Sequence, residues 1–142
     1  MQFNEKTGNI KSVSTLSLSK RFLQTYGGIG MEKLRIGIIG CGGIANGKHM
    51  PALKKLEDVE MVAFCDLIPE RAQKAAAEYG APGAKVFTDY RQLLELDLDA
   101  VNVLTPNISH SSITVDALEA GKHVMCEKPM AINSAEAQKM LD

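Results

Sequence analysis

Hydrophobic residues in this chain follow two alternating patterns from about residue 33 onward. Short continuous apolar runs are typical of strands that are buried on both faces of a sheet. Between these runs, apolar residues recur at helical spacing, which indicates helices that cover the sheet. The runs that predict strands are residues 34–39, 59–65, 85–87, 100–104 and 123–126, and the segments that predict helices are 44–56, 69–79, about 88–94, 109–120 and 134 onward.

The order of these segments predicts an α/β fold. Strands that alternate with helices at this spacing form a parallel, doubly wound sheet with right-handed crossovers. In such a sheet, ligands bind at the carboxyl ends of the strands, beside the point where the strand order reverses. The sequence places glycine, proline and polar residues at those ends, namely at 40–43, 66, 105–107 and 127–129. We therefore expect the functional site there.

Turn-forming residues mark several of the predicted helix boundaries. Pro69 suits the first turn of its helix, whereas Gly80 and Gly121 suit helix ends. Thr88 or Asp89 is expected to cap the short helix that follows, since either side chain can accept a hydrogen bond from a free backbone N–H. These signals support the division into elements that the hydrophobic pattern gives.

The first and the last predicted helices each carry a further expectation. Pro51 lies inside the first helix and is expected to kink it or to delay its regular part. The last helix is expected to begin at Ser134 and to be still running at the final residue, Asp142.

A glycine-rich segment follows the first predicted strand. Gly40, Gly42 and Ala45 fit the spacing G-x-G-x-x-G/A. In that motif the first glycine makes a tight turn, the second lets a pyrophosphate approach the backbone, and the third small residue lets the helix pack on the strand. Gly43 and Ile44 lie in the same turn, where free N–H groups and the positive end of the helix dipole face the phosphates. The pattern predicts a Rossmann-type dinucleotide site.

An acidic residue follows the second predicted strand. Asp66 lies 26 residues after Gly40, somewhat farther than the roughly 20 residues that are usual. A carboxylate at this place accepts hydrogen bonds from both ribose hydroxyl groups and repels a 2′-phosphate, which favours NAD over NADP. Arg71 leaves NADP open, because a guanidinium group can bind a 2′-phosphate. The structural alternative is a solvated aspartate that opens the turn before Pro69.

Composition limits the remaining classes of function. The chain has 142 residues, of which 45% are hydrophobic, and a net charge of −1, which fits a soluble globular domain with a core. Residues 1–30 carry a net charge of +3 and residues 31–142 a net charge of −4. This slightly acidic body gives no reason to expect nucleic acid as a partner. No apolar stretch approaches the roughly 18 residues that a membrane span needs, so we expect no membrane anchor.

Three cysteines, Cys41, Cys65 and Cys126, are far apart and include no C-x-x-C pair. We interpret them as reduced, buried residues of a cytoplasmic protein. A metal or redox cluster is the alternative, because all three lie near predicted strand ends. We predict no metal site, since neither paired cysteines nor supporting histidines occur at ligand spacing.

The first 30 residues differ from the rest of the chain. They are rich in Ser, Thr, Asn, Gly and Lys and show no sustained periodicity. A secretory signal would need an unbroken apolar segment of about 7–15 residues, which is absent here, while a basic, Ser-rich organellar presequence stays open. We expect a disordered upstream extension, with Met31 as the natural start and one dinucleotide-binding domain over residues 31–142.

Several of these motifs together resemble one family, the Gfo/Idh/MocA oxidoreductases, which include glucose–fructose oxidoreductase and inositol dehydrogenase. The similarity covers nearly all of residues 33–142. It implies that a hydride passes between a nicotinamide dinucleotide and a sugar, cyclitol or related polyol. The residues that carry the resemblance are Gly40, Gly42, Ala45, Asp66, Thr105, Pro106, Asn107, His110, residues 117–124 and, most specifically, Glu127, Lys128 and Pro129.

The resemblance implies roles for the last three of these residues. Lys128 would lie near the nicotinamide and the reacting carbon, where its ammonium group polarises the developing alkoxide, and it is the predicted catalytic residue. Glu127 would orient Lys128 or line the cofactor cleft. Pro129 would turn the backbone sharply, with a cis peptide as one option.

Other residues receive less specific roles from the resemblance. Residues 105–107 would border the nicotinamide side of the dinucleotide. His110 would either cap its helix or touch the cofactor. His49 and His123 are expected to be structural or exposed.

One departure from the family affects the expected activity. Family members are well over twice as long, and their second domain supplies substrate contacts, oligomer contacts and the acid–base groups of hydride transfer. We therefore expect a truncated chain, part of a homo-oligomer at full length, that binds dinucleotide with negligible turnover alone. The fifth strand should be a sheet edge with apolar surface beside it.

Two alternative functions stay open at this stage. A non-catalytic sensor or regulatory protein of the same fold would bind a dinucleotide without needing an ammonium group at residue 128. A different Rossmann enzyme, such as a methyltransferase, fits the glycine segment and Asp66 but leaves residues 127–129 unexplained.

Overall fold

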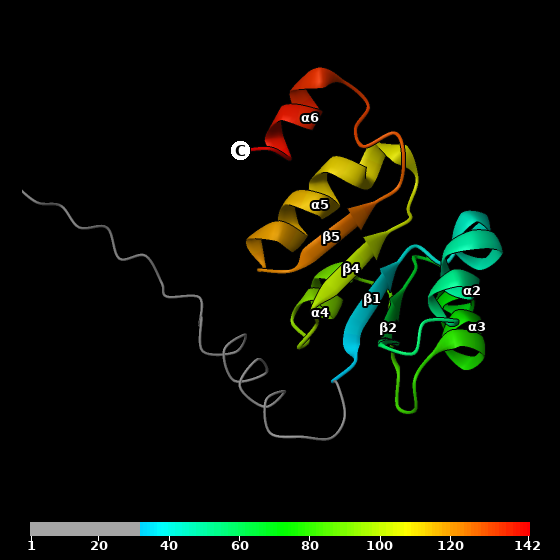
Figure 1. The fold of residues 1–142 in the computed structure, drawn as a ribbon. Coiled ribbons are helices and arrows are strands. Elements are labelled where there is room, and N and C mark those ends of the chain that lie inside the picture. The colour runs from blue at the N-terminus through cyan, green and yellow to red at the C-terminus, as the bar shows by residue number, and fades with distance from the viewer. Residues whose placement is uncertain (1–31) are drawn as a thin grey trace, which may run out of the picture. The chain divides into compact units, whose positions relative to one another are not determined.

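The computed structural model describes residues 32–142, so the extension predicted at residues 1–30 lies outside the described residues. The described part contains a five-stranded sheet with the order β3-β2-β1-β4-β5 (Figure 1). The strands are β1 (Leu34–Ile39), β2 (Val59–Cys65), β3 (Lys85–Phe87), β4 (Ala100–Val103) and β5 (His123–Cys126). All adjacent pairs are parallel, which confirms the predicted sheet. Only β4 ends one residue earlier than predicted.

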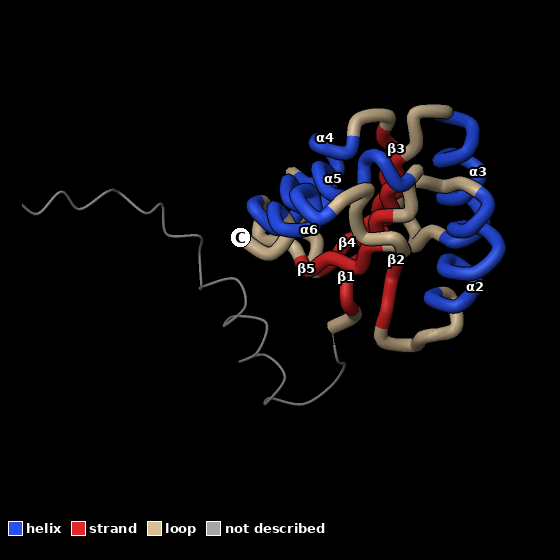
Figure 2. The backbone as a smooth tube through the Cα atoms, turned by 90° about the horizontal axis from the view of Figure 1, so that it is seen from above, coloured by secondary structure: helices blue, strands red, loops and turns tan. Residues whose placement is uncertain are grey.

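Helices cover both faces of this sheet. They are the π-helical turn η2 (Ala45–His49), α2 (Met50–Leu53), α3 (Pro69–Tyr79), α4 (Tyr90–Leu94), the 3-10 turn η3 (Asn107–Ser109), α5 (His110–Glu119) and α6 (Ser134–Lys139). In Figure 2, α2 and α3 lie on one side of the strands, and α4 and α5 lie on the other. The order of the strands reverses at β1, which lies between β2 and β4.

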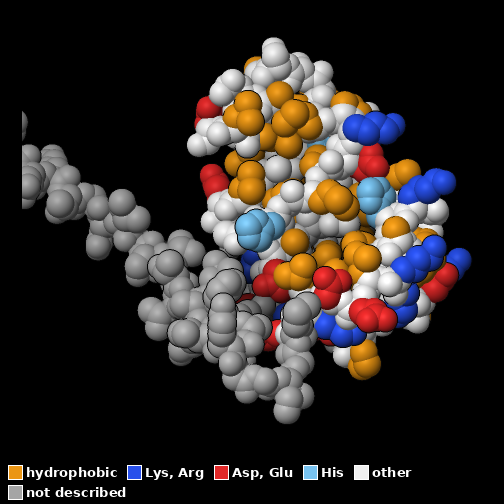
Figure 3. Space-filling model, viewed as in Figure 1, with side chains coloured by type: hydrophobic (Ala, Val, Ile, Leu, Met, Phe, Trp, Pro, Cys, Tyr) orange, Lys and Arg blue, Asp and Glu red, His pale blue; other side chains and the backbone are white. Residues whose placement is uncertain are grey.

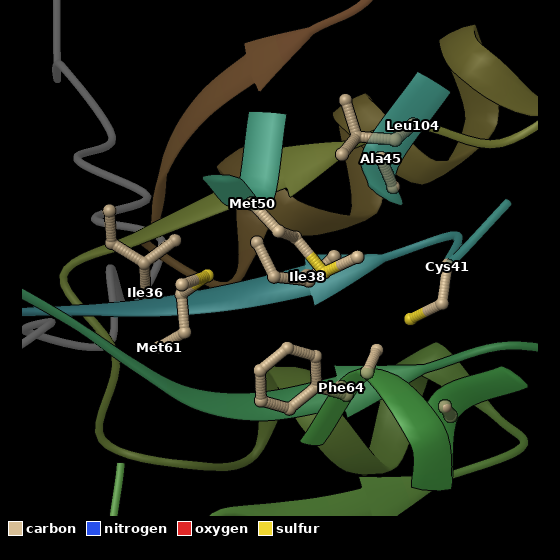
Figure 4. Close-up of a cluster of buried hydrophobic side chains, with 10 residues drawn as sticks. Ile36, Ile38, Cys41, Ala45, Met50, Met61, Phe64 and Leu104 are labelled. Carbon is tan, nitrogen blue, oxygen red and sulfur yellow. The ribbon is translucent and has the colours of Figure 1, made fainter. Parts of the chain in front are cut away.

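The face that α2 and α3 cover holds the first of two cores (Figure 4). Ile38 of β1, Phe64 of β2 and Met50 of α2 are fully buried there. The helix α3 contributes the small side chains of Ala72 and Ala75, so it can pack close to the strands. Burial of one such large apolar side chain contributes roughly 1.5–3 kcal/mol, and this core therefore fixes the helical segment that follows the glycine motif.

The opposite face of the sheet holds the second core. Ile39 of β1 and Val101 of β4 pack there with Leu93 of α4 and Ile113 of α5. Neighbouring residues of a strand point to opposite faces, which is why Ile38 and Ile39 belong to different cores. The continuous apolar run of β1 is thus buried on both sides, as the sequence predicts.

Pro51 changes the type of helix in the first crossover. In η2 the N–H of Met50 donates to the carbonyl of Ala45, five residues back, which is the π-helical pattern. Pro51 then occupies the first turn of α2, where its missing N–H costs nothing. In a regular α-helix its ring would collide with the carbonyl four residues earlier. The predicted irregularity is therefore confirmed, and the helix ends at Leu53, earlier than predicted.

Two of the predicted helix boundaries are confirmed in detail. Asp89 is the residue that caps α4, because its carboxylate accepts a hydrogen bond from the N–H of Arg91 at 3.0 Å. Gly121 follows α5 with a φ of 73°, the left-handed conformation expected of a glycine that ends a helix.

The prediction that the last helix runs to Asp142 is wrong. Asn133 caps α6 through its side chain, and the helix ends at Lys139. The N–H groups of Met140 and Leu141 donate to carbonyl groups three residues back, and that of Asp142 donates to Gln138 four residues back, so the regular helix gives way to a tighter, mixed final turn.

β5 is an edge of the sheet, as predicted, since among the described strands it pairs only with β4. Figure 3 shows hydrophobic side chains scattered over the face of the molecule that Figure 1 presents. Met125 of β5 is 45% exposed, and Ile132 in the following loop is 56% exposed. The apolar surface expected beside the fifth strand is therefore present.

Gly40 ends β1 in a backbone conformation that glycine adopts more readily than other residues. Its φ is +93°, and a Cβ atom at this position would lie 2.7 Å from the carbonyl carbon and oxygen of Leu104. Its N–H donates to the carbonyl of Cys65 at 2.8 Å. At Gly42, by contrast, a Cβ atom would meet no atom within 4 Å.

We predict that Gly40→Ala lowers the melting temperature by at least about 5 °C, whereas Gly42→Ala leaves it nearly unchanged. A left-handed conformation costs a residue with a Cβ about 1–2 kcal/mol, and each kcal/mol shifts the melting temperature of a domain of this size by about 4–8 °C. The clash with the β4 backbone adds to that cost. Scanning calorimetry of both variants measures the effect, and equal melting temperatures would contradict the close approach of β1 and β4.

The two core cysteines are poor nucleophiles in this fold. Burial raises the pKa of Cys41 to about 12, and the charge of Asp66 raises it further. Burial raises the pKa of Cys65 to about 11, with the charges of Asp89 and Asp66 adding to it. Cys41 belongs to the first core and Cys65 to the second, so they point to opposite faces of the sheet. Both are free thiols, as is the half-buried Cys126.

We predict that iodoacetamide at pH 8 alkylates Cys126 first and reaches Cys41 and Cys65 only after unfolding. The thiolate is the reactive form, and raised pKa values together with burial keep these two thiols protonated and inaccessible. Mass spectrometry of tryptic peptides, with and without denaturant, gives the rates. Labelling of Cys41 in the folded chain as fast as labelling of Cys126 would contradict this prediction.

Candidate functional site

A cleft opens at the carboxyl ends of β1, β2 and β4, where the strand order reverses. Its cavity has a volume of about 570 Å³, within the range of small-molecule sites. The glycine segment, the acidic residue after β2 and the segment after β4 meet there. The predicted residues that line the cavity are Gly40, Gly42, Gly43, Ile44, Asp66, Arg71, Thr105 and Pro106.

The glycine segment leaves part of this cleft free of side chains. A Cβ atom at Gly42 or Gly43 would meet no atom within 4 Å, so a ligand can come close to the backbone there. The side-chain amide of Asn46 donates to the carbonyl groups of Cys41 at 2.7 Å and Gly42 at 2.8 Å. Asn46 thus occupies two carbonyl oxygens that would otherwise repel an anionic ligand. Sequence reasoning missed Asn46, although an amide directly after the motif's last small residue was a signal.

Asp66 is held at the cleft by two backbone hydrogen bonds. Its Oδ2 accepts from the N–H of Cys41 at 2.9 Å, and its Oδ1 accepts from the N–H of Ile68 at 2.9 Å. The first of these bonds ties the end of β2 to the glycine segment. Each carboxylate oxygen keeps further acceptor capacity, so the half-buried side chain can also accept from hydroxyl groups of a ligand. Arg71 of α3 is exposed and lines the same cavity.

Apolar side chains form much of the remaining wall. Leu67 is 89% exposed, and Ile44 and Ile68 are each 43% exposed, although all three line the cavity. Exposed aliphatic groups beside a carboxylate can pack against a flat ring of a ligand. Leu67 and Ile68 were also missed, and their signal was an apolar pair placed in a turn between Asp66 and a proline.

Tyr90 of α4 closes the cavity on the side of α5. Its hydroxyl donates to Oδ2 of Asp116 at 2.6 Å. Burial, followed by that hydrogen bond to Asp116, raises the pKa of Tyr90 to about 12. The guanidinium group of Arg91 lies over the Tyr90 ring, 4.6 Å from its centre. The phenol therefore acts as a fixed, neutral part of the wall.

The segment after β4 contributes Thr105 and Pro106 to the cavity. The hydroxyl oxygen of Ser109 lies 2.9 Å from Oγ1 of Thr105 and 2.9 Å from the carbonyl oxygen of Pro106, so it can share hydrogen bonds with both. Asn107 begins η3 and is exposed, outside the residues that line this cavity. The predicted motif is therefore split between the cleft and the adjoining surface.

Glu127, Lys128 and Pro129 form a turn directly after β5. The N–H of Glu127 donates to the carbonyl of Val103 at 3.0 Å, which continues the pairing of β5 with β4. Oε2 of Glu127 accepts from the N–H of Lys128 at 2.8 Å, and the Lys128 side chain is exposed. The peptide between Lys128 and Pro129 is cis, one of the options that the resemblance implies.

His49 reaches this turn from η2. Its Nε2 lies 2.8 Å from Oε1 of Glu127. The hydrogen bond from His49, and then the one from the Lys128 amide, lowers the pKa of Glu127. This contact agrees with the structural role that was one expectation for His49, but its partner, 78 positions away, was not predicted.

His110 and Ala45 are buried away from the cavity. His110 is 1% exposed, with Nδ1 at 2.7 Å from the carbonyl oxygen of Pro129 and Nε2 at 2.8 Å from that of Thr105. It neither caps α5 through its side chain nor lines the cavity. Ala45 is fully buried in the first core, where its small size lets the helix pack on the strand.

Most of the predicted site residues therefore form two groups, whereas Asn107 is exposed outside the cavity and Ala45 and His110 are buried. One group lines the cleft between the glycine segment and Asp66. The other consists of Glu127, Lys128 and Pro129, which lie outside the lining of that cavity and are joined to it through His49 and His110. The loops after β4 and β5 lie side by side because their strands pair.

Residues 32–142 also bear on metal binding and membrane insertion. No cluster of three or more His, Cys, Asp or Glu side chains there is arranged to hold a metal ion. Within the same residues, every helix is too short or too polar to cross a bilayer.

Comparison with known proteins shows which relatives this chain resembles. The chain is 43% identical over 110 residues to a D-glucoside 3-dehydrogenase of Escherichia coli (strain K12). This alignment covers 77% of this chain and 31% of that protein. It matches the crystal structure of KijD10, a 3-ketoreductase from Actinomadura kijaniata in complex with NADP, at 33% identity and a TM-score of 0.71, over 78% of this chain and 34% of that one.

A second crystal structure contains a different dinucleotide. The WlbA dehydrogenase from Bordetella pertussis, in complex with NADH and UDP-GlcNAcA, is 33% identical with a TM-score of 0.71, over 80% of this chain and 32% of that one. The chain thus spans about a third of the length of these relatives.

A family profile matches almost all of the described residues. The family is described as "Oxidoreductase family, NAD-binding Rossmann fold", and the match extends over residues 34–142. The chain belongs to this family, the Gfo/Idh/MocA oxidoreductases.

Proposed function

We propose that this chain is the dinucleotide-binding part of an NAD(P)-dependent oxidoreductase that acts on a sugar, cyclitol or related polyol. The observation that carries the proposal is the meeting of the glycine segment and Asp66 at one cleft, with room at Gly42 and Gly43 for a ligand to approach the backbone. When bound, the nicotinamide cofactor supplies the hydride chemistry. The protein contributes binding, orientation and electrostatics.

The residues of the cleft match the parts of a dinucleotide. Gly42 and Gly43 leave space for a pyrophosphate. Asn46 donates hydrogen bonds to two nearby carbonyl oxygens, which reduces their repulsion of the phosphate charge. Asp66 is placed to accept hydrogen bonds from ribose hydroxyl groups, while the exposed Leu67 and Ile68 offer an apolar surface to the adenine ring. These features fit the group that the family description implies.

Lys128 is the residue that we expect to take part in the chemistry. Its exposed ammonium group stands on the turn after β5, at the same end of the sheet as the cleft. There it would stabilise negative charge that develops on the substrate oxygen as the carbinol carbon gains or loses a hydride. A sensor that only binds dinucleotide would not need this ammonium group. A methyltransferase is not compatible with the family of the chain.

The substrate class, location and assembly are also proposals. The names of the relatives, a glucoside dehydrogenase and a sugar-nucleotide dehydrogenase, support a sugar or polyol as the small-molecule substrate. Three free thiols suit a reducing compartment, so we propose the cytoplasm. We further propose that the full-length protein forms a homo-oligomer and that nucleic acid is not a partner.

We predict that the chain binds NADH more tightly than NADPH, and that Asp66→Ala weakens NADH binding by about 10- to 100-fold. Hydrogen bonds to a charged group contribute about 1.5–3 kcal/mol, and each 1.4 kcal/mol corresponds to a factor of ten in affinity. Isothermal titration calorimetry with both cofactors measures these values. Relatives bind either cofactor, NADP in KijD10 and NADH in WlbA, so the comparison is informative.

Glu70→Ala provides a matched control for this experiment. It also removes one carboxylate, from the first turn of α3, but Glu70 does not line the cavity. Tighter binding of NADPH would mean that Arg71, rather than Asp66, selects the cofactor. Binding of neither cofactor would contradict the proposed function.

We predict that Gly42→Ala, which leaves the fold intact, weakens NADH binding by at least about tenfold. The added methyl group meets no protein atom, so it would enter the space proposed for the pyrophosphate. The same calorimetric titration applies. Unchanged affinity would place the pyrophosphate elsewhere.

A further inference from the structure

The turn of Glu127, Lys128 and Pro129 is held at both ends by histidine side chains from other elements. We propose that His49 and His110 are positioning residues, which fix the backbone on either side of Lys128 and so determine where its ammonium group lies. This inference rests on the function proposed above for Lys128. Neither histidine lines the cleft, so neither is offered as a catalytic residue.

His49 acts on the turn through Glu127. The two side chains are only 21% and 17% exposed, and Nε2 lies 2.8 Å from Oε1. The other carboxylate oxygen, Oε2, accepts the N–H of Lys128 at 2.8 Å. Glu127 therefore bridges the η2 turn and the backbone of Lys128. Its lowered pKa, caused first by the His49 hydrogen bond, shows that the bridge favours the carboxylate form.

His110 acts on the other end of the turn. Its ring, 1% exposed, lies between the carbonyl oxygens of Pro129 at 2.7 Å and Thr105 at 2.8 Å. A carbonyl oxygen only accepts hydrogen bonds, so a ring nitrogen that carries a proton donates to the carbonyl oxygen that faces it. The ring thereby bridges the loop after β4 and the loop after β5.

Lys128 needs such support because its own side chain is exposed and flexible. A lysine carries a compact charge on a four-carbon stem with many rotamers, and small displacements of a catalytic group reduce its effect strongly. The backbone on both sides of Lys128 is fixed by contacts to η2 and α5. The range of positions open to the ammonium group is thus limited by the two histidines.

Matched amide substitutions can separate these contacts from general stability. A glutamine amide nitrogen lies about where Nε2 of histidine lies, and an asparagine amide nitrogen about where Nδ1 lies. At residue 49, His49→Gln keeps the donor to Glu127 and His49→Asn removes it. At residue 110, His110→Asn keeps the donor to Pro129, and His110→Gln keeps only the donor to Thr105.

The first measurement compares the affinities of NADH and ADP-ribose, which lacks the nicotinamide, for the 142-residue chain. We expect His49→Asn and His110→Gln to weaken NADH binding about 3- to 10-fold with ADP-ribose binding unchanged, and their partner variants to retain most of the affinity. Lys128→Met should weaken NADH binding by a similar factor. The double variant Lys128→Met/His49→Asn should bind NADH no more weakly than Lys128→Met alone, because both changes act through the Lys128 ammonium group.

The second measurement needs no cofactor. Carboxyl NMR should show the pKa of Glu127 below its ordinary range in the wild-type chain and in His49→Gln, and nearer that range in His49→Asn. Because the folded pKa is lowered, the stability that this carboxylate contributes is present above its ordinary pKa and is lost as the pH falls through the lowered value. In His49→Asn that loss should be smaller. The amide signal of Lys128 should shift only in the variants that remove a donor to the turn.

The outcomes distinguish this inference from the proposed function. If the wild-type chain binds neither NADH nor ADP-ribose, the proposed function fails. The NMR measurement still tests whether the two histidines fix the turn of Glu127, Lys128 and Pro129. If it binds both but the asparagine and glutamine variants at residue 49 behave alike, the positioning role of His49 is overturned. Equal losses for NADH and ADP-ribose, or losses that add to that of Lys128→Met, would indicate a purely structural role. If substitutions of the buried His110 prevent folding, the comparison of His49→Gln with His49→Asn still tests the positioning role.

Discussion

The close approach of β1 and β4 at their carboxyl ends is the constraint on which the rest of the site depends. The N–H of Leu104 donates to the carbonyl of Ile39, and the N–H of Gly40 donates to that of Cys65, so three neighbouring strands are tied together where the loops begin. The Leu104 carbonyl group fills the space in which a side chain at residue 40 would lie. The chain must therefore turn away from the sheet at a glycine, and the cleft lies where it does so.

Beyond the strand ends, the loops are held by side chains that bond to the backbone of another loop or turn. Asp66 ties the end of β2 to the glycine segment, and His110 ties the loop after β4 to the one after β5. Loop backbone has no ladder partner, so these side chains satisfy polar groups that would otherwise remain unpaired where water is excluded. A neutral bond of this kind contributes about 0.5–1.5 kcal/mol to stability, and a bond to a charged group such as the Asp66 carboxylate about 1.5–3 kcal/mol. Their larger effect is geometric, since they set the positions of loops that lack regular structure.

Much of this arrangement could be predicted from the sequence because its causes are local. The apolar runs give the strands, since burial on both faces allows no polar alternation, and the glycine spacing follows from the turn at Gly40. The contact between His49 and Glu127 could not be predicted in this way, because it joins residues 78 positions apart and depends on the π turn before Pro51. Helical periodicity assumes a regular α-helix. A π turn contains an extra residue, so the side chains that follow it point in other directions than this periodicity predicts. The end of α6 was missed for a similar reason, since a shift to tighter hydrogen bonds leaves no mark in the residue pattern.

The π turn also connects the two separate groups of residues that the proposed function assigns to one reaction. Its first residue, Ala45, is fully buried in the first core, and its last, His49, contacts Glu127 in the turn after β5. The short element that follows the glycine motif is therefore the same element that holds the turn of Lys128. A regular α-helix through this segment would present residue 49 at a different angle, because each turn would contain fewer residues. Pro51, which is incompatible with that regular helix, thus helps to direct the imidazole toward the carboxylate.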